Sequence, residues 1–232
     1  MLSHFAAGGY RFVVAPGRPF SSGIVADPGY DLVHAVFLRP VPLAAGLESA
    51  RQHVEAAGRP ATALAAFELR IPEPLSQEGF DAFNEPYVER MAGLGLRGED
   101  GFVTARTNVA PTIAPVSEPS LYAFTYTVPG GNRPQPAFRV SGAPETLRDG
   151  SAADKLRSIV EALARPMGLL GVTWEAATAI NLYAASVAPA NEVADAFGVA
   201  VLHGVTWFPS VPPLRDLEYE IDVRGVGTEI VL

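Results

Sequence analysis

Arg106, in the segment TARTNVAP (residues 104–111), is a residue that could bind a ligand. Its neighbours are small or β-branched, a composition that favours a β-strand. A guanidinium in a strand can hold a carboxylate by two parallel hydrogen bonds, a geometry that lysine cannot reproduce. The same side chain could instead point to solvent or pair with a buried acid. The segment alone leaves all three roles open.

A second segment of interest is LEYEIDV (residues 217–223), in which Glu218, Glu220 and Asp222 alternate with other residues. Such alternation is how a strand presents one solvated face. A carboxylate beside an apolar wall can also hold a water molecule and accept its proton. Glu220 is therefore either part of a solvated face or a catalytic base.

The sequence shows no pattern typical of a metal site. Its four histidines include no i, i+4 pair that one helix would bring together, and the chain has no cysteine. Disulfides, thiolate ligands and a cysteine nucleophile are excluded. The glycines of PGGN lack the context of a phosphate-binding or dinucleotide-binding loop. We therefore expect neither a metal nor an organic cofactor.

Composition narrows the possible partners and location. The chain has 232 residues, 48% of them hydrophobic, and a net charge of -8 from 17 basic and 25 acidic residues. No segment is basic enough to follow a phosphate backbone, so we expect no nucleic-acid partner. No apolar run reaches the roughly 18 residues of a membrane span, and the first residues lack the features of a signal peptide. We expect a soluble, cytoplasmic protein with no membrane partner.

The order of predicted elements repeats along the chain. The first half predicts a helix at 44–58 ending at Gly58, a strand at 63–71, a helix at 78–95, and strands around Arg106 and Tyr122. The second half predicts the same order: a helix capped by Ser151, a strand at 176–186, a helix at 189–204, and strands in VTWFPS and LEYEIDVRGV. PGGNRPQP (129–136) connects the halves. We predict two tandem α+β domains, 1–128 and 129–232, each with a sheet covered on one face by two helices.

Five short segments are similar to motifs of one known family. They are RPFSSGI (18–24), FDAFNEPY (80–87), ARTNV (105–109), AFRVSGAPE (137–145) and DLEYEIDV (216–223). With these segments, each half resembles the RidA/YjgF family of reactive-intermediate (imine and enamine) deaminases. The resemblance implies small chorismate-mutase-like α+β domains that assemble around a threefold axis, with sites in the clefts between neighbouring domains.

The resemblance assigns the carboxylate-binding side of a site to the first half. Arg106 corresponds to the arginine that binds the substrate carboxylate, and Asn84 to the helix asparagine beside it. Asn108 stands where the family often has cysteine, and Phe20 stands where its opening motif has tyrosine. This half lacks the Ser-Gly strand of the family, and none of residues 121–125 is acidic.

The complementary side falls in the second half. Ser141 and Gly142 match the Ser-Gly pair of the family, and Glu220 matches its water-activating glutamate. The arginine position of this half falls near Val205, so the carboxylate clamp is missing. If the Arg106 edge of one half faces the Glu220 edge of the other, the two rebuild one complete site.

Two functions from different classes follow from this division. The first is a RidA-like hydrolytic deaminase acting on small carboxylate-bearing imines or enamines at a composite cleft between domains. The alternative is a non-catalytic ligand-binding or assembly protein that retains the fold. We also predict a homotrimer, because each half presents a sheet face that its helices do not cover.

Overall fold

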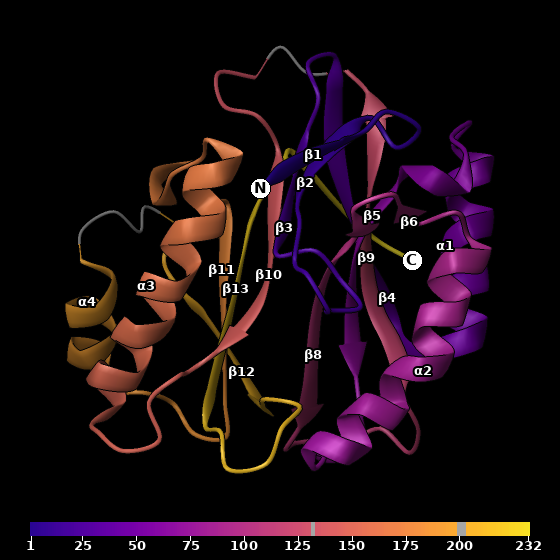
Figure 1. Cartoon of the computed structure of the whole chain (residues 1–232). Helices are drawn as coiled ribbons and strands as arrows, with labels where there is room; N and C mark the ends of the chain where they lie inside the picture. Colours follow the sequence, from indigo (N-terminus) through magenta and orange to yellow (C-terminus); the bar gives the residue numbers. More distant parts are fainter. Residues whose placement is uncertain (131–132, 199–202) are drawn as a thin grey trace.

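Helices occupy two opposite flanks of the molecule, with most of the strands between them (Figure 1). The computed structural model describes residues 1–130, 133–198 and 203–232. One flank carries α1 (Leu43–Ala56) and α2 (Gln77–Gly93), and the other carries α3 (Ala152–Leu170) and α4 (Ala190–Phe197). Among the described residues, no helix combines the length and the hydrophobicity needed to cross a bilayer.

The two halves have the same sheet topology. The first half contains β4 (Tyr30–Pro42), β5 (Leu64–Arg70), β8 (Ala105–Pro111) and β9 (Ser120–Pro129). The second contains β10 (Phe138–Pro144), β11 (Ala179–Ala184), β12 (Thr206–Val211) and β13 (Tyr219–Gly225). In the first half β5 is parallel to β8 and antiparallel to β9, and in the second β11 is parallel to β12 and antiparallel to β13. The predicted α+β fold, with one design used twice, is confirmed.

The two half-sheets join into one sheet. Strands near each end of the chain pair with the half-sheet formed by the other half of the chain. β12 pairs with β8 through two residue pairs, Ser210–Pro111 and Val211–Ala110. The remaining strands of this sheet are β1 (Leu2–Phe5), β2 (Tyr10–Val13), β3 (Gly23–Ala26) and β14 (Thr228–Val231). β3 pairs with β10, and β14 pairs with β4, so each end of the chain completes the other half. The domain boundary at 128/129 therefore stays a prediction, since hydrogen bonding crosses it in both directions.

Local signals place the helices close to their predicted positions. Ser151 begins α3 with a capping box, in which its side chain and that of Asp154 each accept a backbone N–H. Gly58 follows α1 with φ +76, as expected for a C′ residue. Part of the helix predicted at 189–204 lies at 199–202, outside the described residues. The minor elements are β6 (Arg97–Gly98), β7 (Gly101–Phe102) and the 3-10 turns Ala61–Ala63 and Trp174–Ala176.

The hairpin of β2 and β3 lies between two hydrophobic cores. Tyr10, Phe12 and Ile24 belong to the core of the first half. Val13 and Val25 belong to the core under α3 in the second half. Because successive strand residues point to opposite faces, a single hairpin can pack against both cores. The chain segment that follows β2 is therefore held at the junction of the halves, next to the predicted site.

The sheet faces that point away from the helices meet across a buried polar cluster. Arg139 Nη2 lies 2.9 Å from Glu68 Oε1 and 2.8 Å from Asp222 Oδ2. Thr107 and Tyr183 also donate hydrogen bonds to Asp222 Oδ2, at 2.7 and 2.8 Å. The contacts of Arg139 and Thr107 join β5 and β8 to β10 and β13, which are not their neighbours in the strand order. The face on which the trimer prediction rested is thus covered within one chain, and the oligomeric state stays a prediction.

Candidate active site

Arg106 is a buried cation with aromatic walls. Its side chain leaves the residue only 3% exposed, and its Nη1 donates a 2.7 Å hydrogen bond to Asn84 Oδ1 on α2. The guanidinium lies 4.5 Å from the ring centre of Phe20 and 4.7 Å from that of Tyr87. Within the described parts of the chain, no carboxylate forms an ion pair with Arg106. The solvent and ion-pair interpretations of this arginine are therefore wrong.

Ser141 and Gly142 meet the edge of the strand that carries Arg106. The backbone N–H of Arg106 donates to Ser141 Oγ at 2.9 Å, and that hydroxyl donates to the carbonyl oxygen of Ser21 at 2.6 Å. A Cβ atom on Gly142 would overlap with Glu220 Oε1. A side chain at 142 would therefore displace the Glu220 carboxyl group from its position against β10.

Glu220 lies in the interior beside these residues. Burial, followed by the negative charge of Asp222, raises the pKa of Glu220 to about 8, while a backbone hydrogen bond from Asn108 and the charge of Arg106 lower it less. Glu220 and Asp222 are 3% and 0% exposed, so the solvated-face interpretation of their alternation is wrong. Only Glu218 fits it, with a side chain that is 61% exposed. A carboxyl group with such a pKa can both donate and accept a proton near neutral pH.

Several buried polar atoms at this point have no partner. Arg106 Nε, both amide atoms of Asn108 and Glu220 Oε2 form no hydrogen bond to any residue that the structure describes. Buried polar atoms in proteins are almost always hydrogen-bonded, because leaving them unpaired is costly. These atoms belong to Arg106 and Asn108 of the first half and to Glu220 of the second half. The arrangement points to a site for a polar ligand.

The register of the second half shows what replaces the arginine there. Arg106 is paired with Phe67 across the parallel strands β8 and β5. Trp207 is paired with Leu182 across the equivalent strands β12 and β11. Phe67 and Leu182 both lie in the core of their half. Ile180, one step back on the same face of β11, also lies in this core, so the position of Arg106 corresponds to Trp207 or to Val205. In either register the second half has no guanidinium there.

The first half lacks the glutamate in the same way. Glu220 is paired with Tyr183 across β13 and β11. The equivalent pair across β9 and β5 is Ala123 with Glu68 or, one step along the same face, Ser120 with Arg70. Neither Ala123 nor Ser120 is acidic. At these positions the chain thus has one arginine, Arg106, and one glutamate, Glu220. The structure brings them into the same part of the molecule.

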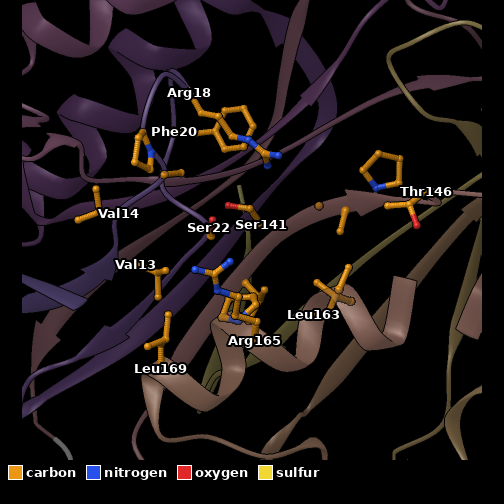
Figure 2. A pocket seen from close by; sticks show the side chains of 18 of the residues that line it. Val13, Val14, Arg18, Phe20, Ser22, Ser141, Thr146, Leu163, Arg165 and Leu169 are labelled. Atoms are coloured by element: carbon orange, nitrogen blue, oxygen red, sulfur yellow. The ribbon is translucent and has the colours of Figure 1, made fainter. Parts of the chain in front are cut away.

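A pocket of about 430 Å³ adjoins the residues around Arg106 and Glu220 (Figure 2). It lies between α3 and residues 13–22, and the residues around Ser141 line it from β10. Phe20, Ser141 and Gly142 line the pocket, and each of them contacts Arg106 or Glu220. Within residues 1–130, 133–198 and 203–232, no group of three or more His, Asp or Glu side chains is placed to hold a metal ion.

The fold and the residues of this site define a RidA/YjgF-like protein with two tandem domains. A family model described as 2-aminomuconate deaminase CnbZ matches residues 2–230, and the chain belongs to this family. It is 34% identical over 252 residues to a 2-amino-5-chloromuconate deaminase of Comamonas testosteroni, with 98% of both chains covered.

Two solved structures are similar to this chain. A chorismatase matches 89% of this chain and 77% of its own length with a TM-score of 0.51 at 12% identity, a likeness that concerns the fold alone. A YjgF-family protein of Mycobacterium tuberculosis is 22% identical and matches 41% of this chain and 82% of its own length, with a TM-score of 0.33.

Proposed function

We propose that this protein is a hydrolytic deaminase that converts a carboxylate-bearing enamine of the 2-aminomuconate type to a ketone and ammonia. The observation that carries the proposal is the burial of Arg106 and Glu220, one from each half, close enough for their charges to interact, with unpartnered polar atoms on both and on Asn108. The family description and the name of the Comamonas relative support the substrate class.

Arg106 binds the carboxylate next to the reacting carbon. Asn84 accepts from Nη1 and fixes the rotation of the guanidinium, which leaves Nε free to donate to the substrate. The aromatic rings of Phe20 and Tyr87 keep water away from this contact, which strengthens it. The unpartnered amide of Asn108 is available to the same ligand.

Glu220 acts first as an acid and then as a base. With a pKa of about 8 it is largely protonated at neutral pH, and it donates its proton to the enamine carbon of C=C–NH2. The products of this step are an iminium group and the Glu220 carboxylate. The carboxylate then accepts a proton from the water that adds to the iminium carbon. The resulting carbinolamine moves its hydroxyl proton to nitrogen and releases ammonia, and Glu220 is again protonated.

Ammonia release from 2-aminomuconate, compared between the wild type and Glu220→Gln, tests this proposal. We expect the wild type to release ammonia faster than the uncatalysed reaction. The variant should bind the substrate but lose turnover, because its amide can neither supply nor accept the proton. Substrate binding by the wild type without ammonia release would favour the binding-protein alternative. Full activity of the variant would remove Glu220 from the mechanism.

A further inference from the structure

We propose that Arg18 and Arg165 bind the second carboxylate of a dicarboxylate substrate, so that the site selects dienedioates over chains with one carboxylate. The inference rests on the proposed function, because it assumes that the first carboxylate lies on Arg106. It concerns the outer part of the 430 Å³ pocket, which the Arg106–Glu220 pair itself does not line.

The pocket is a continuation of the buried site. Phe20 lies over the Arg106 guanidinium, Ser141 accepts the Arg106 backbone N–H, and Gly142 lies against the Glu220 carboxyl group. All three also line the pocket. A ligand held at Arg106 and longer than a few atoms therefore extends past β10 into this space.

Two cations flank the outer part of the pocket from opposite walls. Figure 2 shows Arg165 reaching from α3 toward Ser22 and Ser141, while Arg18 lies beside Phe20 on the facing segment. Both arginines are exposed, and neither forms an ion pair with any described residue, although acidic residues outnumber basic ones in the chain. Two free guanidinium groups facing one pocket form an anion-binding pair.

The one acidic residue that the described pocket lining contains, Glu145, forms no ion pair with either arginine, and both its carboxylate oxygens accept hydrogen bonds from another strand. Glu145 Oε1 accepts the backbone N–H of Glu218 at 2.6 Å, and its Oε2 accepts that of Tyr219 at 2.9 Å. Glu145 thus ties β10 to the start of β13. Its carboxylate is directed to the backbone of that strand, and the two arginines remain available for a ligand.

The walls between the two anion-binding ends suit an unsaturated carbon chain. Leu163 and Leu169 of α3 and Val14 of the facing segment line the pocket. A conjugated dienedioate is stiff, so its two carboxylates stay apart and little conformational freedom is lost when both ends bind. A substrate with one carboxylate satisfies Arg106 and leaves the outer arginines unused.

A matched pair of ligands and a matched pair of variants test the inference. Muconate and sorbate have the same six-carbon diene but carry two carboxylates and one carboxylate, respectively. Arg18→Gln/Arg165→Gln removes both pocket arginines, and Arg39→Gln/Arg157→Gln removes two exposed arginines that do not line the pocket. The two double variants therefore lose the same charge. Affinities are measured by isothermal titration calorimetry after circular dichroism confirms folding.

We expect the wild type and the control variant to bind muconate more tightly than sorbate. In Arg18→Gln/Arg165→Gln the muconate affinity should fall by about tenfold, the size of one lost charge-assisted hydrogen bond, while the sorbate affinity stays the same. Unchanged muconate affinity would overturn the inference, as would an equal loss for both ligands.

Activity separates this inference from the proposed function. If the wild type releases no ammonia from 2-aminomuconate but the binding pattern holds, the deaminase proposal fails and the dicarboxylate site stands. If the wild type is active and Arg18→Gln/Arg165→Gln keeps the same KM for 2-aminomuconate, the function stands and the role of the two arginines is refuted.

Discussion

Glu220 should make the free energy of unfolding fall as the pH rises from about 5 to 8. Its pKa in the folded protein is raised from 4.5 to about 8, first by burial and then by Asp222. The folded state therefore binds this proton more tightly than the unfolded state does. The resulting stabilisation is complete below pH 4.5 and is lost as the pH rises through the folded-state pKa.

The size of the effect follows from the interval between the two pKa values. Each pKa unit corresponds to about 1.4 kcal/mol, so the interval from 4.5 to about 8 corresponds to roughly 5 kcal/mol for this fully buried group. Glu220→Gln does not titrate. The stability of this variant relative to wild type should therefore rise by an amount of that order between pH 5 and pH 8.

Urea unfolding of wild type and Glu220→Gln at intervals from pH 5 to pH 9 measures this difference. Groups such as His34 titrate in both proteins, so their contributions to the pH dependence of the unfolding free energy largely cancel in the comparison. Ser141→Ala is the control, because it alters the same cleft without removing an ionisable group, and its offset from wild type should not depend on pH. A pH-independent offset for Glu220→Gln as well would refute the raised pKa and the proton-transfer role built on it.

Four further outcomes are expected. Arg106→Lys should keep the fold but lose carboxylate binding, since the bidentate geometry is gone; equal thermal stabilisation of wild type and variant by small 2-keto acids would remove Arg106 from the site. The rate constant kcat/KM for ammonia release should fall above about pH 8, where Glu220 loses its proton, and a rate still rising at pH 9 would contradict this order of steps. Gly142→Ala should cost about 1–3 kcal/mol of unfolding free energy through its overlap with Glu220, as measured in urea. Light scattering at micromolar concentration tests the homotrimer prediction; because the sheet face on which it rested is covered within one chain, a trimer would have to form through another surface, and a monomer would refute the prediction.

The helices and most central strands could be predicted because their signals are local. The capping residue Ser151, the terminating Gly58 and the apolar spacing along each helix act within a few residues of the chain. The repeated order of elements then indicated two halves of one design. That order needs no knowledge of which strands pair across the molecule.

Pairing between the halves could not be predicted in the same way. The hydrogen bonds of β3 with β10 and of β14 with β4 join segments distant in sequence, and no local pattern specifies them. The same limit applies to Glu220 and Asp222. Alternating acids are typical both of a solvated strand face and of a buried polar one, and only the opposing Arg139 distinguishes the two.

The site was predicted in part. Family resemblance indicated Arg106, Asn84, Ser141, Gly142 and Glu220, and the structure brings them together, while their functional roles stay proposals. Of the aromatic residues around Arg106, the resemblance pointed only to Phe20. Phe80, Phe83 and Tyr87 lie near the Arg106 guanidinium, but their spacing is typical of the core side of any helix.

The outer arginines had no signal in the sequence. Arg18 and Arg165 lie far apart in the chain, and each stands among residues typical of a surface loop or an exposed helix face. Only the folding of residues 13–22 against α3 brings them to one pocket.

The crystal structure of Glu220→Gln with bound 2-aminomuconate would test the composite site most directly, because this variant should bind the substrate without consuming it. We expect the carboxylate beside the amino group on Arg106, the amino-bearing carbon next to position 220, and the rest of the chain between β10 and α3. A ligand that contacts Arg106 but lies beyond reach of position 220, or that binds away from both, would contradict a shared catalytic site.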